Sequence, residues 1–162
     1  MIITETKVLA LLAKHRINYV LREHQPIYTV AEGKALGLPN VEAAAKSLLV
    51  TDDKHAHFYL VVLPLDKRLD LQKLRAALSS RRLTMATAEE LQKLLALTPG
   101  AVTPLALPCD EHKQVHTIID EDLRDNTIAL PLLCNTKTIW LSCHKLMKAL
   151  QEMGHPISYL PL

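Results

Sequence analysis

The chain has 162 residues, of which 49% are hydrophobic and 22% charged, a balance ordinary for a soluble globular protein. Its 19 basic and 17 acidic residues give a formal net charge of +2 without any run of five like charges, which argues against a protein that coats duplex nucleic acid. No apolar stretch approaches the roughly 18 to 20 residues of a membrane-spanning helix. These features predict one soluble domain over residues 1–162.

Cysteine usage indicates a reducing compartment. The three cysteines, Cys109, Cys134 and Cys143, are an odd number and form no CxxC motif. The first segment, MIITETKVLALLAKH, has neither the basic region nor the small-residue cleavage site of a secretory signal. We therefore expect a cytoplasmic protein.

The first part of the chain predicts a helix, a strand and a second, short helix. Apolar residues recur at helical spacing within residues 4–15, and residues 18–21 form a short apolar run typical of a strand. In PIYTVAEGKALGLP, Thr29 and Glu32 have the spacing of a capping box, which favours a helix start. Thr29 can therefore be a helix cap without any further role.

The middle of the chain predicts a hairpin followed by two helices. Two nearly continuous apolar runs, 48–50 and 58–63, flank the polar segment DDKHAH. This pattern is typical of a hairpin in a central sheet that helices cover. Asp70 and Thr87 precede apolar segments of helical period and are placed to cap helices there.

The last part of the chain predicts three strands and a closing helix. The strand-like segments are VHTIID, TIAL and TIWL. Residues 142–153 have helical periodicity, and Gly154 with Pro156 ends that helix. Because strands and helices do not alternate strictly, the pattern predicts an α+β fold.

Common catalytic and cofactor motifs are absent from the sequence. It contains no GxGxxG or GxxxxGKS/T nucleotide-binding fingerprint, and no GxSxG or CGSC context for a protein nucleophile. The closest histidine pairs, His55 with His57 and His112 with His116, lack further ligands at the usual spacing, so polar loop or strand-edge positions are preferred over a metal site. A hydrolase with its own covalent nucleophile is not expected.

Two features indicate a binding site. In AAAKSLLV, Lys46 starts a run that otherwise indicates a buried strand, so its ammonium either reaches water or enters a pocket that favours positive charge. In PGAVTP, Gly100 and Pro104 bracket a short loop whose amides can be aimed at an oxygen, because glycine permits close backbone approach and proline fixes the far end. A surface lysine and an ordinary turn explain the same residues.

Several ordered segments together resemble the YbaK/ProX family of aminoacyl-tRNA deacylases, which is related to the editing insertion of bacterial prolyl-tRNA synthetases. They span nearly the whole chain: HQPIYTVAEGKALGLP, AAAKSLLV, FYLVVLPLDKRLDL, LTPGAVTPLAL, VHTIIDEDL and NTKTIWLS. The resemblance implies an α+β fold in which helices surround a mixed, partly barrel-like sheet. It also implies a pocket for the terminal adenosine of tRNA and its mischarged amino acid. The stand-alone ProX-like proteins, which the chain resembles most, act on alanyl-tRNA with the proline anticodon.

The resemblance assigns roles to particular residues. It places Lys46 and Gly100 in catalysis. The substrate-binding residues that it implies are Thr29, Ser47, Ala101, Val102, Thr103, Pro104, Asn135 and Thr136. In one departure, many relatives carry a histidine-proline pair shortly before the NT dipeptide, and in this chain either Pro131 or Leu130 stands in for that histidine. This departure leaves the amino-acid preference open.

The implied mechanism follows from the reactivity of an aminoacyl ester. The site has to position a water molecule and stabilise the oxyanion at the carbonyl, which the amides of the Gly100 loop can do. Lys46 would anchor a phosphate or hydroxyl of the terminal nucleotide, and the adenosine's own hydroxyl would assist in activating the water. No metal or organic cofactor is expected.

The leading hypothesis is a metal-independent hydrolase that deacylates mischarged tRNA in trans. Ala-tRNA(Pro), or a similar small amino acid on tRNA(Pro), is the expected substrate. The expected partner is the aminoacylated 3′ end of tRNA, with a transient association with a synthetase and no membrane contact. The alternative, motivated by the missing histidine, is a non-catalytic aminoacyl-tRNA or nucleotide-binding module that kept the fold and lost turnover.

Specificity would depend on further residues. A small apolar pocket can exclude the proline ring, and its candidate walls are Ile27, Leu132 and Leu133. Contacts with the tRNA body would come from basic residues, for which solvated surface is nevertheless the preferred interpretation. These basic residues are Lys67, Arg68, Arg81 and Arg82.

Overall fold

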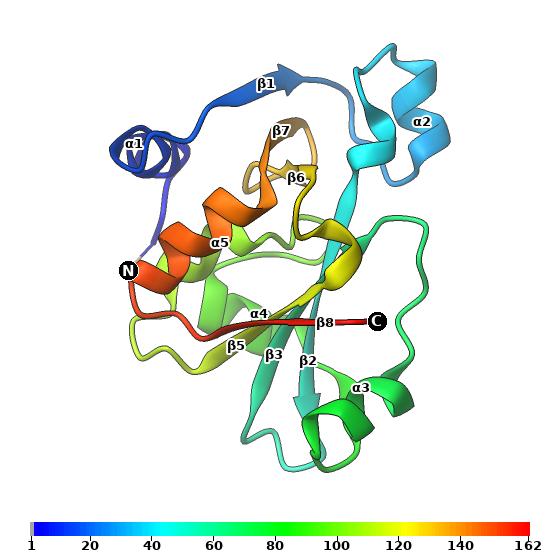
Figure 1. Ribbon diagram of the computed structural model, residues 1–162, viewed down its shortest axis with the longest axis vertical. Helices are drawn as coiled ribbons and strands as arrows, with labels where there is room; N and C mark the ends of the chain where they lie inside the picture. Colours follow the sequence, from blue (N-terminus) through cyan, green and yellow to red (C-terminus); the bar gives the residue numbers. More distant parts are fainter. Residues whose placement is uncertain (1) are drawn as a thin grey trace.

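The computed structural model describes residues 2–162, so Met1 of the expected domain lies outside the described residues. Five α-helices are described: α1 (Glu5–Lys14), α2 (Val30–Ala35), α3 (Leu71–Leu78), α4 (Ala88–Leu95) and α5 (Cys143–Glu152). The strands are β1 (Tyr19–Glu23), β2 (Ala45–Asp52), β3 (Phe58–Pro64), β4 (Leu83–Met85), β5 (Val115–Asp120), β6 (Thr127–Pro131), β7 (Lys137–Ser142) and β8 (Ile157–Leu160). Three short 3-10 helices, η1 (Val41–Ala43), η2 (Pro104–Cys109) and η3 (Glu121–Leu123), complete the order (Figure 1).

The described strands form two sheets. The first is antiparallel, with the order β1-β7-β6, and the second has the order β4-β2-β3-β5-β8. In the second sheet β2 pairs antiparallel with β3 and β4, whereas β5 pairs parallel with β3 and β8. An isolated parallel bridge between Ala44 and Ala129 links the two sheets at the start of β2. The predicted α+β class is confirmed, and the bridge accounts for a partly barrel-like arrangement that stays open.

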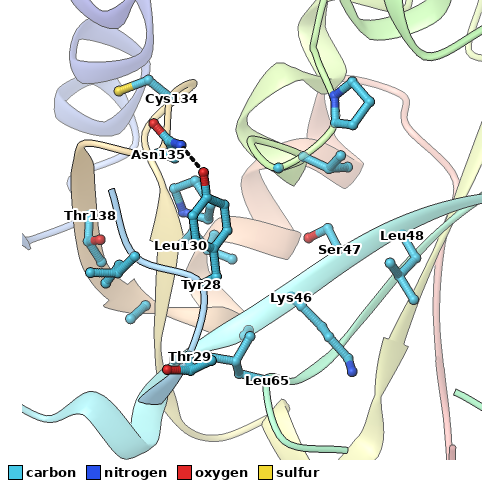
Figure 2. Close-up of a pocket in the computed structure, with 18 of the residues that line it drawn as sticks. Tyr28, Thr29, Lys46, Ser47, Leu48, Leu65, Leu130, Cys134, Asn135 and Thr138 are labelled. Carbon is cyan, nitrogen blue, oxygen red and sulfur yellow. Dashed lines mark hydrogen bonds between the residues drawn. The ribbon is translucent and has the colours of Figure 1, made fainter. Parts of the chain in front are cut away.

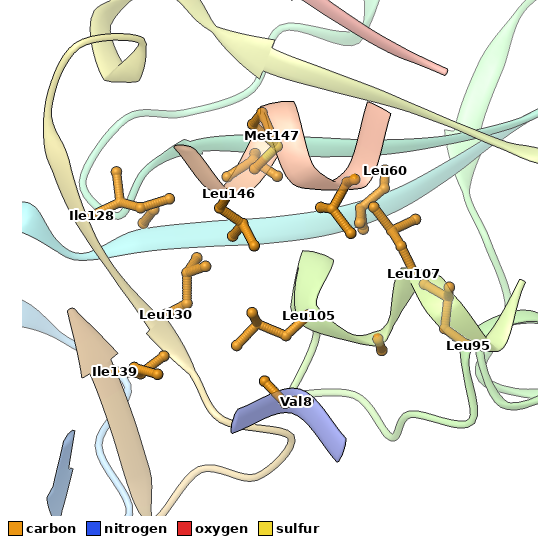
Figure 3. Close-up of a cluster of buried hydrophobic side chains, with 14 of the residues drawn as sticks. Val8, Leu60, Leu95, Leu105, Leu107, Ile128, Leu130, Ile139, Leu146 and Met147 are labelled. Carbon is orange, nitrogen blue, oxygen red and sulfur yellow. The ribbon is translucent and has the colours of Figure 1, made fainter. Parts of the chain in front are cut away.

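The main hydrophobic core lies between the two sheets and the helices that flank them. Figure 3 shows Val8 of α1, Leu130 of β6 and Leu146 of α5 directed toward the same interior, all of them buried. A second cluster, with Leu74 of α3 and Ile118 of β5, covers the other face of the larger sheet. Burial on both faces explains why the strands of the predicted hairpin read as continuous apolar runs.

Local helix signals are confirmed. The side chains of Thr29 and Asp70 accept hydrogen bonds from backbone amides at the starts of α2 and α3. Thr87 and Glu90 form a complete capping box at the start of α4. Such caps stabilise a helix by about 1 kcal/mol each, and they depend on residues within one turn.

Two strands were not predicted from the sequence. Strand β4 has three residues and β8 has four, and each is held by a partner far away in the chain. Strands this short carry too few residues for a periodic signal. The pairing of β8 with β5 therefore depends on the placement of α5, which returns the chain to that edge of the sheet.

The predicted polar role of the histidine pairs agrees with their contacts. His57 Nδ1 lies 2.8 Å from a carboxylate oxygen of Asp52, and His55 pairs with Glu90. His116 Nε2 lies 2.8 Å from the hydroxyl of Ser158. Within residues 2–162, no group of three or more His, Cys, Asp or Glu side chains is arranged to hold a metal ion. No helix in this part of the chain is long and apolar enough to cross a membrane.

Candidate functional site

A cavity of about 370 Å³ opens beside the start of β2. Its walls come from the β1–α2 loop, α2, the first half of β2, the β4–α4 segment, the Gly100 loop, β6, and the β6–β7 turn with β7. Segments more than one hundred residues apart in the sequence thus meet around one space. The volume falls in the range typical of small-ligand sites.

The lining is mostly apolar, and its charged groups are all basic. Among the described residues that line the cavity there are two lysines, Lys46 and Lys137, and no aspartate or glutamate. Lys137 is already paired, because its Nζ donates to Glu5 at 2.7 Å, and this bond raises the pKa of the lysine. Lys46 has no ion pair or hydrogen-bond partner for its ammonium in the described part of the chain. The cavity therefore offers one uncompensated positive charge, which favours an anionic ligand group.

Lys46 and Ser47 extend from opposite faces of β2, as neighbouring strand residues must. Figure 2 shows the hydroxyl of Ser47 directed toward Tyr28 and Leu130, while Lys46 extends away from them, on the side of Leu48. Ser47 is 6% exposed, whereas Lys46 is partly exposed. Both residues line the cavity, but they border different parts of it.

The Gly100 loop presents two unused amides. The Ala101 N–H donates to the carbonyl of Thr98 at 3.2 Å, whereas the N–H groups of Gly100 and Val102 have no acceptor among residues 2–162. Gly100 has a φ of +91°, a left-handed conformation that favours glycine. Gly100 and Val102 line the cavity. These two amides, and not that of Ala101, are the ones available to an oxyanion.

The remaining loop residues hold the loop in place. Ala101, Thr103 and Pro104 are buried and do not line the cavity. The Thr103 hydroxyl accepts a hydrogen bond from the Leu105 amide at 3.3 Å and caps η2. The structure therefore gives these three predicted substrate-binding residues positions behind the cavity wall.

Of the two residues of the predicted NT dipeptide, only one borders the cavity. Asn135 lines the cavity, and Thr136 does not. The carbonyl of Thr136 accepts the amide of His24 at 2.9 Å, and its hydroxyl lies 3.4 Å from the Cys134 sulfur. Thr29 lines the cavity as well as capping α2, so its role as a cap is compatible with the predicted contact with substrate.

Sequence reasoning did not select Tyr28. Its side chain is 61% exposed, and its phenol oxygen accepts a hydrogen bond of 3.1 Å from Asn135 Nδ2. A Cβ atom placed on Gly100 would lie 3.9 Å from the Tyr28 ring. The available signal was compositional, because the chain has few aromatic residues and this one stands in a loop next to the predicted Thr29.

The predicted size-setting residues are corrected in part. Ile27 lines the cavity, but Leu132 and Leu133 do not, because Leu132 is buried in the main core and Leu133 packs against that core. Leu130 and Pro131, the two residues considered as replacements for the family histidine, do line it. The wall at this position is therefore aliphatic.

Two of the basic residues considered for the tRNA body are neutralised within the protein. Lys67 Nζ lies 2.7 Å from the buried carboxylate of Asp120, and Arg81 pairs with Asp53 at 2.6 Å. The pKa values of both cations are raised by these hydrogen bonds. A phosphate would have to compete with these carboxylates, which agrees with the interpretation of these positions as surface.

The sequence matches the family model of the aminoacyl-tRNA editing domain over residues 24–149. The prolyl-tRNA editing protein ProX of Acetoanaerobium sticklandii is 35% identical over 156 residues, which are 96% of this chain and 95% of that protein. The prolyl-tRNA synthetase associated domain-containing protein 1 of Danio rerio is 29% identical over 140 residues, 82% of this chain and 73% of that protein. The solved structure of a proposed trans-editing enzyme for prolyl tRNA synthetase has a TM-score of 0.68 at 21% identity and covers 100% of this chain and 99% of that chain. The matched range contains every residue that lines the cavity.

Proposed function

Since the chain belongs to the aminoacyl-tRNA editing domain family and is an aminoacyl-tRNA deacylase, we propose that it acts in trans on tRNA(Pro) mischarged with a small amino acid, alanine being the expected one. The similar ProX protein is named for prolyl-tRNA editing and aligns over nearly its whole length, which supports the choice of tRNA(Pro). The reaction belongs in the cytoplasm, where charged tRNA is used.

One observation supports particular residues as the groups that bind and activate the substrate. The cavity brings together Lys46, with an uncompensated ammonium, and the unused amides of Gly100 and Val102. A cation and a pair of free amides are what a negatively charged nucleotide end and an ester carbonyl require. The absence of acidic groups from the described lining leaves the phosphate without a repulsive neighbour.

The reaction is the addition of water to the ester carbonyl, followed by loss of the ribose oxygen. The products are the free amino acid and tRNA with a free terminal hydroxyl. The amides of Gly100 and Val102 stabilise the oxyanion, and because the loop holds them in place they need little rearrangement as the charge develops. Lys46 binds a phosphate or hydroxyl of the terminal nucleotide, and the hydroxyl of that nucleotide assists in activating the water.

Specificity against correctly charged prolyl-tRNA would be steric. The cavity walls include the buried leucines Leu49, Leu91 and Leu130. Cores of this kind resist expansion, because a larger group forces side chains off their rotamers. We expect these walls to admit a methyl group and to exclude a proline ring.

The direct test uses purified protein and tRNA(Pro) charged with alanine or with proline. We expect the protein to release alanine faster than spontaneous hydrolysis and to leave prolyl-tRNA intact, and we expect EDTA to have no effect on the rate. An alanine release rate equal to that without protein would contradict the proposal.

The aliphatic wall at Leu130 motivates one alternative function, a module that binds aminoacyl-tRNA without turnover. Such a module would protect charged tRNA from spontaneous hydrolysis. The same time course separates the two functions, because protection slows the release of alanine and deacylation accelerates it.

A further inference from the structure

The hydroxyl of Ser47 is a buried polar group without a partner. The side chain is 6% exposed, and its oxygen has no hydrogen bond within residues 2–162. A hydroxyl removed from water in this way destabilises the empty protein unless something completes its hydrogen bonding. Figure 2 shows it directed into the cavity, toward Tyr28 and Leu130. A ligand group is thus able to supply the missing bond.

The charge of the surroundings limits what that ligand group can be. The buried neighbours Leu49 and Leu130 are aliphatic, and no carboxylate of the described chain lines the cavity. A protonated α-amino group placed here would be a desolvated cation without a counter-ion, which is strongly unfavourable. A neutral group that both donates and accepts a hydrogen bond suits Ser47 better.

The side chain of Leu130 offers no polar group to a ligand in the cavity. Leu130 is fully buried and lines the cavity, and its aliphatic side chain contributes no hydrogen bond to the bound amino acid. The remaining polar lining residues, such as Thr29, Thr87 and Asn135, are more exposed than Ser47. Polar recognition in the buried part of the cavity therefore depends on Ser47.

We propose that the Ser47 hydroxyl hydrogen-bonds the side-chain hydroxyl of a seryl group, so that the pocket clears seryl-tRNA(Pro) in preference to alanyl-tRNA(Pro). The inference rests on the proposed deacylase function and adds serine to its substrates. Seryl differs from alanyl by one oxygen atom, so a pocket that admits alanine needs little extra space for serine. An alanyl group leaves the Ser47 hydroxyl unpaired, and a site that hydrogen-bonds its substrate discriminates against the analogue that lacks the group.

The experiment compares kcat/KM for seryl- and alanyl-tRNA(Pro) in the wild type, Ser47→Ala and Thr117→Val. Thr117 is a matched control, because its hydroxyl is also buried without a partner in the described chain but does not line the cavity. We expect the wild type to favour seryl-tRNA by about threefold to tenfold, the range of one net hydrogen bond. Ser47→Ala should abolish this preference by slowing the seryl reaction alone, and Thr117→Val should retain it.

Thermal melting adds a readout that is independent of activity. Removing an unpaired buried hydroxyl should leave the Tm of Ser47→Ala unchanged or raise it. A Tm lower by several degrees would overturn the proposal, since it would reveal a partner for the hydroxyl within the protein. An equal loss of activity of Ser47→Ala on seryl- and alanyl-tRNA would also overturn it. The Ser47 hydroxyl would then contact a part of the substrate that both charged tRNAs share. If the wild type hydrolyses neither substrate, the proposed function fails together with this inference.

Discussion

Asn135 Nδ2 donates a 3.1 Å hydrogen bond to the phenol oxygen of Tyr28, although 107 positions separate the two residues in the sequence. The bond joins the β1–α2 loop to the β6–β7 turn across the lining of the cavity. It fixes the orientation of the aromatic ring of Tyr28, a residue that is 61% exposed. An exposed, oriented ring beside a basic cavity is suited to stacking on a nucleic-acid base.

This arrangement predicts the behaviour of Tyr28 variants. Tyr28→Ala should raise KM for charged tRNA about tenfold with little change in kcat, because base stacking contributes binding more than chemistry. Tyr28→Phe keeps the ring and loses the bond to Asn135, so its KM should rise by less than about threefold. Steady-state kinetics of both variants measure the difference. Equal effects of Phe and Ala would assign the role to the hydroxyl instead.

Lys46 should be essential for activity and dispensable for folding. Lys46→Ala should lose about 2–4 kcal/mol of transition-state binding, or roughly 30- to 900-fold in kcat/KM. Stability should change little, since the ammonium has no partner within the described chain. Lys46→Arg should not restore the rate, because a planar guanidinium of different reach does not replace a point charge in a confined site. Wild-type rates in the alanine variant would make Lys46 a surface residue.

Gly100 should be needed for its backbone conformation. With φ at +91°, Gly100→Val strains the backbone by about 1–3 kcal/mol and moves the amides that face the carbonyl, so activity should fall by more than tenfold. Gly154→Val is the matched control, with a φ of +95° and a position outside the cavity lining. It should lose similar stability in thermal melts and keep its deacylation rate. Loss of activity in both variants would assign the effect to stability.

His155 should make the fold less stable at mildly acidic pH. It is 2% exposed, and neither ring nitrogen has a hydrogen-bond partner within residues 2–162. Burial lowers the pKa of this imidazole, and the charge of Lys113 lowers it further against the opposite effect of Asp110. The unfolded chain, with a histidine pKa near 6.5, then binds more protons than the folded chain below that pH. The free energy of unfolding should therefore decrease as pH falls below about 6.5.

Chemical denaturation between pH 7.5 and 5.5 measures this dependence. His155→Gln should show a smaller decrease than the wild type, and part of the decrease should remain because burial lowers the pKa of His116 as well. The carboxyl of Asp52 does not interfere, since hydrogen bonds from the Ala56 amide and from His57 lower its pKa to about 2. Identical pH profiles for the wild type and the variant would exclude His155 as the cause.

Much of the secondary structure could be predicted from the sequence, because its signals are local. The caps at Thr29, Asp70 and Thr87 bond to amides within three residues, and the hairpin of β2 and β3 closes through one short turn. Lys46 and Gly100 were selected for the same reason, since an unusual residue at a strand start or in a loop is visible in its own segment. The strict alternation of strand residues also places Lys46 and Ser47 on opposite faces without further information.

The tertiary structure decided which residues line the cavity. The sheet order, with β7 between β1 and β6, brings Tyr28 to Asn135, and the bridge between Ala44 and Ala129 sets β2 against β6. Leu130 and Leu132 both belong to the main core, and of the two only Leu130 also borders the cavity. The amino-acid types determine which segments form strands and helices, because those signals act over a few residues. Which residues share one pocket depends on how distant strands pair and pack, since the free energy that selects this arrangement comes from burying the whole core at once.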